Sequence, residues 1–160
     1  AIHDLLLGKM KAAVRIKWPN DVMIGKRKVC GILIENQIQG QQVSQTVIGI
    51  GLNVNQVSYD VAAATSLAVE SGKTFDLPDL LDDLIHLLEQ RYLQLRGGRQ
   101  EELKVEYKDK LYWLDESHTF VADGQTFEGL VRGVDDQGKL VIQTGDVSRH
   151  FSFQEVRFVQ

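Results

Sequence analysis

The sequence is poor in features that define several large protein classes: it has one cysteine, two prolines and no long apolar run. A single cysteine excludes an internal disulfide framework, and Cys30 in an apolar stretch is most simply a small buried side chain in a reducing compartment. The apolar runs are too short and too interrupted to span a bilayer. Because the net charge is −4, any surface for nucleic acid would have to be local. These absences favour a soluble, cytoplasmic protein that has no membrane partner.

At 160 residues the chain can bury one good core, or form one domain with a small appendage. Its first thirteen residues fit the end of a helix whose earlier turns are missing, and no capping residue precedes them. We therefore expect an N-terminally truncated domain.

The stretch 14–34 combines apolar strand-forming residues with charged groups that a core cannot accept without partners. Residues 14–18 alternate apolar and charged side chains, which predicts a strand with one buried face. Pro19 ends that strand because it has no N–H to donate. Residues 22–24 resume a strand, and a tight turn containing a glycine leads into a long apolar strand over 28–38.

A lysine therefore leads directly into a buried strand. The Lys28 ammonium can hold an anion as a compact point charge, while Asn20 and Asp21 at a strand end offer hydrogen bonds and a possible metal ligand. The competing interpretation is a solvated hairpin tip, because residues 25–28 read Gly-Lys-Arg-Lys. Composition alone leaves both interpretations open.

The run 47–55 is apolar but contains Gly49 and Gly51. Glycines inside a buried strand indicate either a close approach of another group to the backbone or a β-bulge. The run is not a dinucleotide-binding fingerprint, because no glycine-rich turn into a helix follows it.

Helical periodicity then predicts three helical segments. A short helical turn over 65–70 is closed by Gly72. A long helix follows, with Asp76 as its N-cap and Gly97 at its end. A second long helix is expected over 100–112, with its charges on a solvated face.

From residue 117 onward the pattern changes to five short alternating strands separated by turns rich in Gly and Asp. About forty residues of such a meander predict a small SH3-like β-barrel. The expected fold is therefore α+β. We expect a mixed sheet with flanking helices over 1–113, followed by the barrel over 114–160.

Three motifs now stand in one order: Lys17-Trp18-Pro19-Asn20-Asp21, the stretch Arg27 to Glu35, and the stretch Ile48 to Asn55. Together with Ala64-Thr65-Ser66-Leu67 and the terminal barrel, they closely resemble biotin protein ligases, the biotin–[acetyl-CoA-carboxylase] ligases of bacteria. The resemblance covers nearly the whole chain. It implies that residues 1–113 are the C-terminal portion of a class II synthetase-like catalytic domain.

The resemblance also implies a two-step reaction. Biotin and ATP give biotinyl-5′-adenylate and pyrophosphate, and the biotinyl group then passes to a lysine of a biotin carboxyl carrier protein. Lys28 is the implied catalytic lysine, which contacts the biotin carboxylate and the phosphoryl group. Asp21 is the second implied catalytic residue, which helps to hold Mg²⁺ or orients the incoming lysine.

The remaining implied site residues bind substrate. Asn20 lies at the adenylate, and Gly31 and Ile32 line the biotin tail. On the adenine side the resemblance implies Asn53 together with the backbone at Gly49 and Gly51, whereas Trp18 is a packing residue.

Three family features have no counterpart in this sequence: a Gly/Arg-rich loop that folds over biotin and the phosphates, an earlier strand that recognises the ureido ring, and the winged-helix DNA-binding domain of the bifunctional members. We therefore expect this chain to be partly or wholly inactive alone and not to bind DNA. Exposed strand edges would favour association, including a possible homodimer. The alternative function is a non-catalytic module that binds a carrier protein or a second copy of itself.

Overall fold

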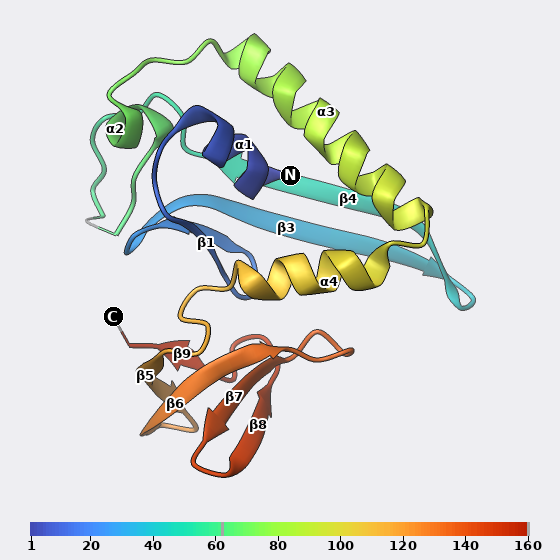
Figure 1. The fold of residues 1–160 in the computed structure, drawn as a ribbon, viewed down its shortest axis with the longest axis vertical. Helices are drawn as coiled ribbons and strands as arrows, with labels where there is room; N and C mark the ends of the chain where they lie inside the picture. Colours follow the sequence, from blue (N-terminus) through green and yellow to red (C-terminus); the bar gives the residue numbers. More distant parts are fainter. Residues whose placement is uncertain (62, 160) are drawn as a thin grey trace. The chain divides into compact units, whose positions relative to one another are not determined.

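The computed structural model describes residues 1–61 and 63–159, which form an α+β fold of two sheets and four helices (Figure 1). The chain divides into two compact units. The first unit comprises Ala1–Arg15 and Asn20–Leu93, and the second comprises Ile16–Pro19 and Gln94–Gln160. The second unit thus begins before the last predicted helix, whereas the sequence places a domain boundary between residues 113 and 114.

The first sheet has four strands in the order β1-β2-β3-β4. Their bounds are Val14–Lys17 for β1, Asp21–Ile24 for β2, Arg27–Gln39 for β3 and Gln42–Leu52 for β4. β2 pairs antiparallel with β3, and β3 pairs antiparallel with β4. The prediction of a mixed sheet is therefore corrected. Two-residue turns at glycines of positive φ join these consecutive strands, and such hairpins can only produce antiparallel pairs.

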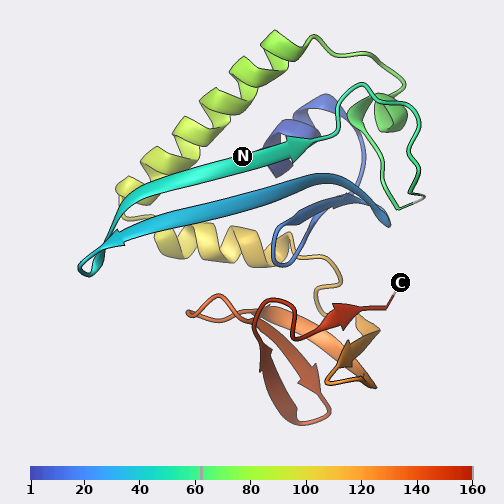
Figure 2. The ribbon, with the colours of Figure 1, turned by 180° about the vertical axis from the view of Figure 1, so that it is seen from behind.

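Three helices accompany this sheet: α1 (Ile2–Lys9), α2 (Leu67–Ser71) and α3 (Leu77–Arg96). Figures 1 and 2 show α1 and α3 along the same side of the long β3–β4 hairpin. The buried core joins the elements through one shared set of apolar side chains, which includes Leu5, Leu6, Val22, Val29, Cys30, Leu67, Leu80 and Leu84.

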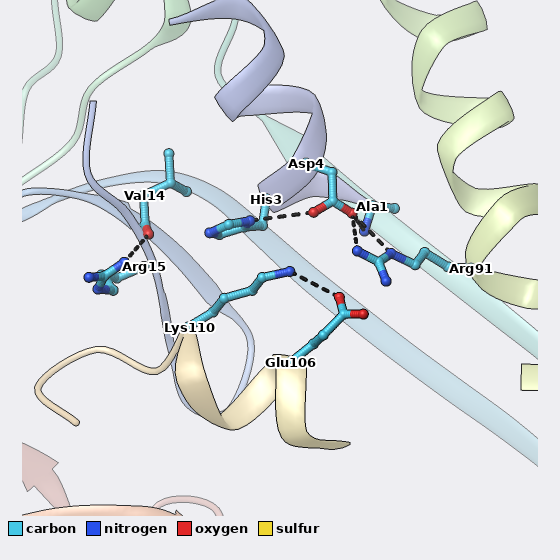
Figure 3. A network of polar contacts seen from close by, with 8 residues as sticks. All are labelled: Ala1, His3, Asp4, Val14, Arg15, Arg91, Glu106 and Lys110. Carbon is cyan, nitrogen blue, oxygen red and sulfur yellow. Dashed lines mark hydrogen bonds and ion pairs between the residues drawn. The ribbon is translucent and has the colours of Figure 1, made fainter. Parts of the chain in front are cut away.

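A polar contact also joins α1 to α3. The Arg91 guanidinium donates from Nε and Nη2 to Asp4 Oδ2 at 3.0 and 2.8 Å (Figure 3). Two charge-assisted hydrogen bonds to one carboxylate oxygen hold the two side chains together.

The predicted end of α2 at Gly72 and both predicted ends of α3 are confirmed, whereas the helix predicted over 100–112 ends earlier, at Asp109. Ser66 caps α2 by accepting a hydrogen bond from Val69 N at 3.1 Å, and Gly72 follows α2 in the left-handed conformation with φ of 69°. Asp76 caps α3 by accepting from the N–H of Asp79 at 3.1 Å. Local side-chain chemistry therefore sets these boundaries.

The second unit contains α4 (Gln100–Asp109) and a five-stranded sheet in the order β8-β7-β6-β5-β9. The strand bounds are Ser117–Ala122 for β5, Gln125–Val134 for β6, Leu140–Thr144 for β7, Val147–Phe151 for β8 and Arg157–Phe158 for β9. All of its strand pairs are antiparallel, which agrees with the predicted meander. Phe120, Val131, Leu140 and Ile142 form the centre of its core.

Trp18 belongs to the core of this second unit. Its side chain is 8% exposed, and its indole Nε1 donates to the backbone oxygen of Gly138 at 3.0 Å. In the neighbouring residues, Ile16 exchanges backbone hydrogen bonds with Lys110 and Tyr112. The first predicted motif is therefore divided between the two units, because Asn20 and Asp21 lie in the first.

Among the helices within the described residues, none combines the length and the apolar character that crossing a membrane requires.

Candidate active site

Lys28 and Asp21, at the paired strands β3 and β2, form an ion pair in the first unit. Lys28 Nζ lies 2.6 Å from Asp21 Oδ1, and the two side chains are 46% and 27% exposed. Because both side chains retain access to solvent, the pair can exchange partners with a ligand instead of being locked in a core. The sequence prediction that these two residues form a site is consistent with this geometry.

A β-bulge determines where the Lys28 side chain points. Lys28 and Gly31 are three residues apart, so a regular strand would direct them to opposite faces. In the pairing of β2 with β3, Val22 is opposite Cys30 but the next residue, Met23, is opposite Lys28. Val29 is therefore the extra residue of a bulge, and the bulge returns Lys28 to the face that carries Gly31.

Gly31 provides the space that the lysine occupies. A Cβ atom at this position would lie 3.0 Å from Lys28 Nζ, 3.2 Å from its Cε and 3.8 Å from Asp21 Oδ1. Asp21 is also the direct cross-strand partner of Gly31. The ion pair therefore lies across a residue that has no side chain, and any ligand held by the ammonium would lie against the Gly31 backbone.

The glycines at 49 and 51 extend this surface. Gly51 is opposite Gly31 and Gly49 is opposite Leu33, so all of these residues lie on one face of the β3–β4 hairpin. A Cβ atom at Gly49 or at Gly51 would meet other atoms only at 3.7 Å or beyond. This face is therefore open, and it presents backbone and one exposed leucine beside the lysine and the carboxylate.

Ile32 lies on the opposite face of the hairpin, where its partly buried side chain packs against the core of the first unit. Asn20, which is half-buried, accepts a hydrogen bond at its backbone oxygen from the Ile32 N–H at 2.8 Å. The structure therefore brings Asp21, Lys28 and the glycines together, connects Asn20 to them through the backbone, and directs the Ile32 side chain elsewhere.

Asn53 follows strand β4 directly and makes hydrogen bonds to two other segments of the chain. Its Nδ2 donates to the backbone oxygen of Thr65 at 2.9 Å, and its N–H donates to the backbone oxygen of Val29 at 2.9 Å. Asn55 makes a comparable pair of side-chain contacts with the backbone of Phe75. The two asparagines of the third motif therefore connect strand β4 to later segments of the chain.

The residues around the pair also limit what chemistry is available. Burial raises the pKa of the adjacent Cys30 thiol to about 11, so this thiol stays protonated at neutral pH and is a poor nucleophile.

Within the part of the chain that the structure describes, no group of three or more His, Cys, Asp or Glu could hold a metal ion. A divalent cation at Asp21 would therefore need most of its ligands from a phosphate-bearing substrate and water.

Three residues that sequence reasoning did not assign to the site are connected to Lys28 or to each other by hydrogen bonds and an ion pair: Arg27, Thr65 and Glu70. Glu70 Oε1 accepts a hydrogen bond from the Thr65 hydroxyl at 2.5 Å and lies 2.7 Å from Arg27 Nη2. The only sequence signal for them was that Thr65 lies in the Ala64-Thr65-Ser66-Leu67 motif and that Arg27 begins the second motif.

Two family models match this chain. The family model described as "Biotin/lipoate A/B protein ligase family" matches residues 2–53, and the one described as "Biotin protein ligase C terminal domain" matches residues 119–158. The first match includes Lys28, Asp21 and the three glycines of the open face. This chain belongs to the biotin protein ligase family.

Two curated relatives give the extent of the similarity. "Bifunctional ligase/repressor BirA" of Bacillus spizizenii is 33% identical over 134 residues, which cover 81% of this chain and 41% of that protein. "Biotin--[acetyl-CoA-carboxylase] ligase" of Mycobacterium tuberculosis is 32% identical over 144 residues, which cover 88% of this chain and 51% of that protein. This member of the family thus spans about half the length of the curated relatives it matches.

A solved structure shows the same fold. The "Biotin protein ligase from Aquifex aeolicus in complex with biotin and ATP" has a TM-score of 0.77 at 23% sequence identity, and the match covers 99% of this chain and 68% of that one. Nearly every element of this biotin protein ligase family member therefore has a structural counterpart in that enzyme.

Proposed function

We propose that this chain carries the catalytic site of an ATP-dependent biotin ligase. The reaction would join biotin and ATP to biotinyl-5′-adenylate with release of pyrophosphate, and then transfer the biotinyl group to a lysine of a biotin carboxyl carrier protein. Family membership supports this proposal, as do a relative named for biotin ligation to acetyl-CoA carboxylase and a structural neighbour that was solved with biotin and ATP.

The observation that carries the proposal is the Lys28 ammonium, held 2.6 Å from Asp21 over the Gly31 backbone on an open sheet face. In the first step a biotin carboxylate oxygen attacks the α-phosphorus of ATP, and the bond to pyrophosphate breaks. Negative charge then gathers between the carboxylate and the α-phosphate. A positioned ammonium at that point lowers the barrier because it favours the charge of the transition state over that of the separated reactants.

Asp21 has its role in the second step. There the neutral amine of the carrier lysine attacks the acyl carbon of the adenylate, the bond to AMP breaks, and the attacking nitrogen passes a proton to water. A carboxylate beside the reacting carbon can accept a hydrogen bond from the incoming amine and orient it. The same carboxylate would supply one ligand to Mg²⁺, which neutralises phosphate charge when it is bound with ATP.

The substrate-binding residues follow from the two faces of the hairpin. Gly31 would let the biotin tail approach the backbone beside Lys28, and Gly49 with Gly51 would do the same on the adenine side. Asn20 would contact the adenylate from the strand end. We keep Ile32 and Asn53 as contributors through the backbone, because the Ile32 side chain packs in the core and Asn53 Nδ2 donates to Thr65.

The finer features of the fold belong to the same proposal. A class II synthetase-like catalytic part would occupy residues 1–113, and the five strands after residue 114 would form the SH3-like domain. The part of the β3–β4 hairpin nearest its turn is the proposed docking surface for a protein partner. It exposes apolar side chains, which include Leu33, Ile34, Ile38, Val43, Val47 and Ile48. A carrier protein or a second copy of the chain would dock along it.

The direct test is to incubate the full chain with labelled biotin, ATP and Mg²⁺ and to measure pyrophosphate release and label on a carrier domain. Biotin-dependent release of pyrophosphate followed by transfer to the carrier lysine is expected when a segment bearing the Gly/Arg-rich loop is supplied, and at a reduced rate or not at all from this chain alone. Omission of biotin is the control for simple ATP hydrolysis. Binding of the carrier domain without pyrophosphate release or label would instead favour a non-catalytic interaction module.

A further inference from the structure

We infer that Glu70 is a positioning residue for Lys28, acting through Thr65 and Arg27. The inference rests on the proposed function to the extent that Lys28 is the lysine that acts on the substrate. Glu70 itself lies on the short helix α2, and its side chain is 12% exposed.

The backbone of Lys28 is held by a distant segment of the chain. The Lys28 N–H donates to the backbone oxygen of Ala63 at 2.7 Å, and the Thr65 N–H donates to the backbone oxygen of Lys28 at 2.9 Å. Lys28 and Ala64 form a parallel bridge between these two bonds. Both backbone polar groups of the lysine are therefore fixed by one short segment, although Lys28 lies beside the irregular bulge residue Val29.

Glu70 contacts both the segment 63–65 and strand β3, the two parts of the chain that pair at Lys28. A single carboxylate oxygen, Oε1, accepts the Thr65 hydroxyl at 2.5 Å and contacts Arg27 Nη2 at 2.7 Å. Thr65 belongs to the segment and is fully buried, whereas Arg27 is the residue immediately before Lys28 in β3. The carboxylate thus joins the segment to the strand one residue away from the lysine, with contacts that are strong because the acceptor and one donor are charged.

Residues 63–66 also make hydrogen bonds that do not involve Glu70. Ser66 Oγ donates to the backbone oxygen of Gln56 at 2.6 Å, and Asn53 Nδ2 donates to the backbone oxygen of Thr65 at 2.9 Å. These bonds keep α2 and the segment in place without Glu70. What Glu70 adds is the connection to Arg27, and hence to the start of β3.

Loss of this connection lets the backbone before Lys28 move while the fold remains. A displacement of the ammonium by a fraction of an ångström is enough to lower the rate of a positioned reaction. We expect Glu70→Ala to reduce kcat for biotinyl-adenylate formation about tenfold, with less than a threefold change in KM for biotin. Thr65→Val should produce a smaller loss, and Thr65→Ser, which retains the hydroxyl, should restore activity to near the wild-type value.

A double-mutant cycle separates positioning from general damage. If Glu70 acts through Lys28, Glu70→Ala should change the residual rate less than twofold in a Lys28→Ala background. A tenfold loss in both backgrounds, or wild-type kcat in Glu70→Ala, would overturn the inference. Thermal unfolding of each variant shows whether the comparison is made between folded proteins.

A readout that is independent of ligase activity distinguishes this inference from the proposed function. The acylation rate of Lys28 by a small amine-reactive ester can be followed by peptide mass spectrometry, with Lys73 as the internal reference. Glu70→Ala should accelerate acylation of Lys28 at least threefold, because the ammonium leaves the Asp21 contact more often, and should leave Lys73 unchanged. An unchanged Lys28 rate would refute the positioning role. If the rate responds but wild-type protein makes no adenylate, the positioning role stands and the proposed function fails.

Discussion

Gly31→Ala is the substitution for which the structure predicts the clearest separation between activity and stability. The new Cβ atom would lie 3.0 Å from Lys28 Nζ and 3.2 Å from Lys28 Cε. Ordinary contacts between such atoms lie at about 3.5 Å or more, so the ammonium must retreat by roughly 0.5 Å. The Lys28 side chain can do this because it is 46% exposed.

The expected loss follows from electrostatics. Moving a unit charge from about 2.8 to about 3.3 Å from a developing negative charge costs roughly 1 kcal/mol at an effective dielectric constant of about 20. A loss of that size is about a fivefold decrease in the rate of adenylate formation. The stability change should stay within about 1 kcal/mol, because replacing a strand glycine by alanine is itself favourable by about 0.5–1 kcal/mol.

The assay is single-turnover formation of biotinyl-adenylate, measured beside chemical denaturation of the same variant. Gly49→Ala is the folding control, since its Cβ atom would meet only Leu33 atoms at 3.7 and 3.8 Å. Gly8→Ala in α1, where a Cβ atom would meet nothing within 4 Å, is the control for activity. A wild-type rate in Gly31→Ala would refute the placement of the substrate beside Lys28 and Gly31.

Three further outcomes are expected in the second unit. Trp18→Phe removes the indole N–H that bonds the β6–β7 turn and should lower the free energy of unfolding by about 1–2 kcal/mol, as measured by urea denaturation. Gly129→Ala places a Cβ atom 2.5 Å from Ile142 Cγ2 and should destabilise by about 1–3 kcal/mol in the same measurement. A hydrogen bond from His150 lowers the pKa of Asp135. The contact therefore stabilises the fold at pH values above the usual carboxyl pKa, and this stabilisation is lost as the pH falls through the lowered pKa. His150→Gln should raise the pKa of Asp135 toward 3.8, as followed by NMR titration; an unchanged value would contradict the assignment.

Local patterns in the sequence predicted the elements well. The alternation before Pro19, the turn at Gly25 and the glycines after α2 and α3 correspond to features of the structure, because each depends on neighbouring residues alone. The two ends of helix α3 were predicted for the same reason.

The arrangement of the site could not be predicted in the same way. The face on which the Lys28 side chain lies depends on the bulge at Val29, which is visible only from the pairing with β2. The resemblance grouped Ile32 with Gly31, although neighbouring residues of a strand lie on opposite faces.

Contacts between distant residues were also outside the reach of local patterns. Trp18 was expected to be a packing residue, and it packs in the core of the second unit, where its indole bonds Gly138, 120 residues later. In the sequence, Glu70 lies 42 residues after Lys28 and 43 residues after Arg27. No local signal connects these residues. The sequence analysis expected a mixed sheet, whereas β2 with β3 and β3 with β4 form antiparallel hairpins.

The most direct test of the central claim is the rate of biotinyl-5′-adenylate formation in wild-type protein and in Lys28→Ala, measured by mass spectrometry of the released adenylate. The proposed role predicts that the variant forms the adenylate at least about a hundredfold more slowly, equivalent to roughly 3 kcal/mol of transition-state stabilisation. Its thermal unfolding should be nearly unchanged, because a half-exposed ion pair contributes at most about 1 kcal/mol. Equal rates in the two proteins would contradict the account.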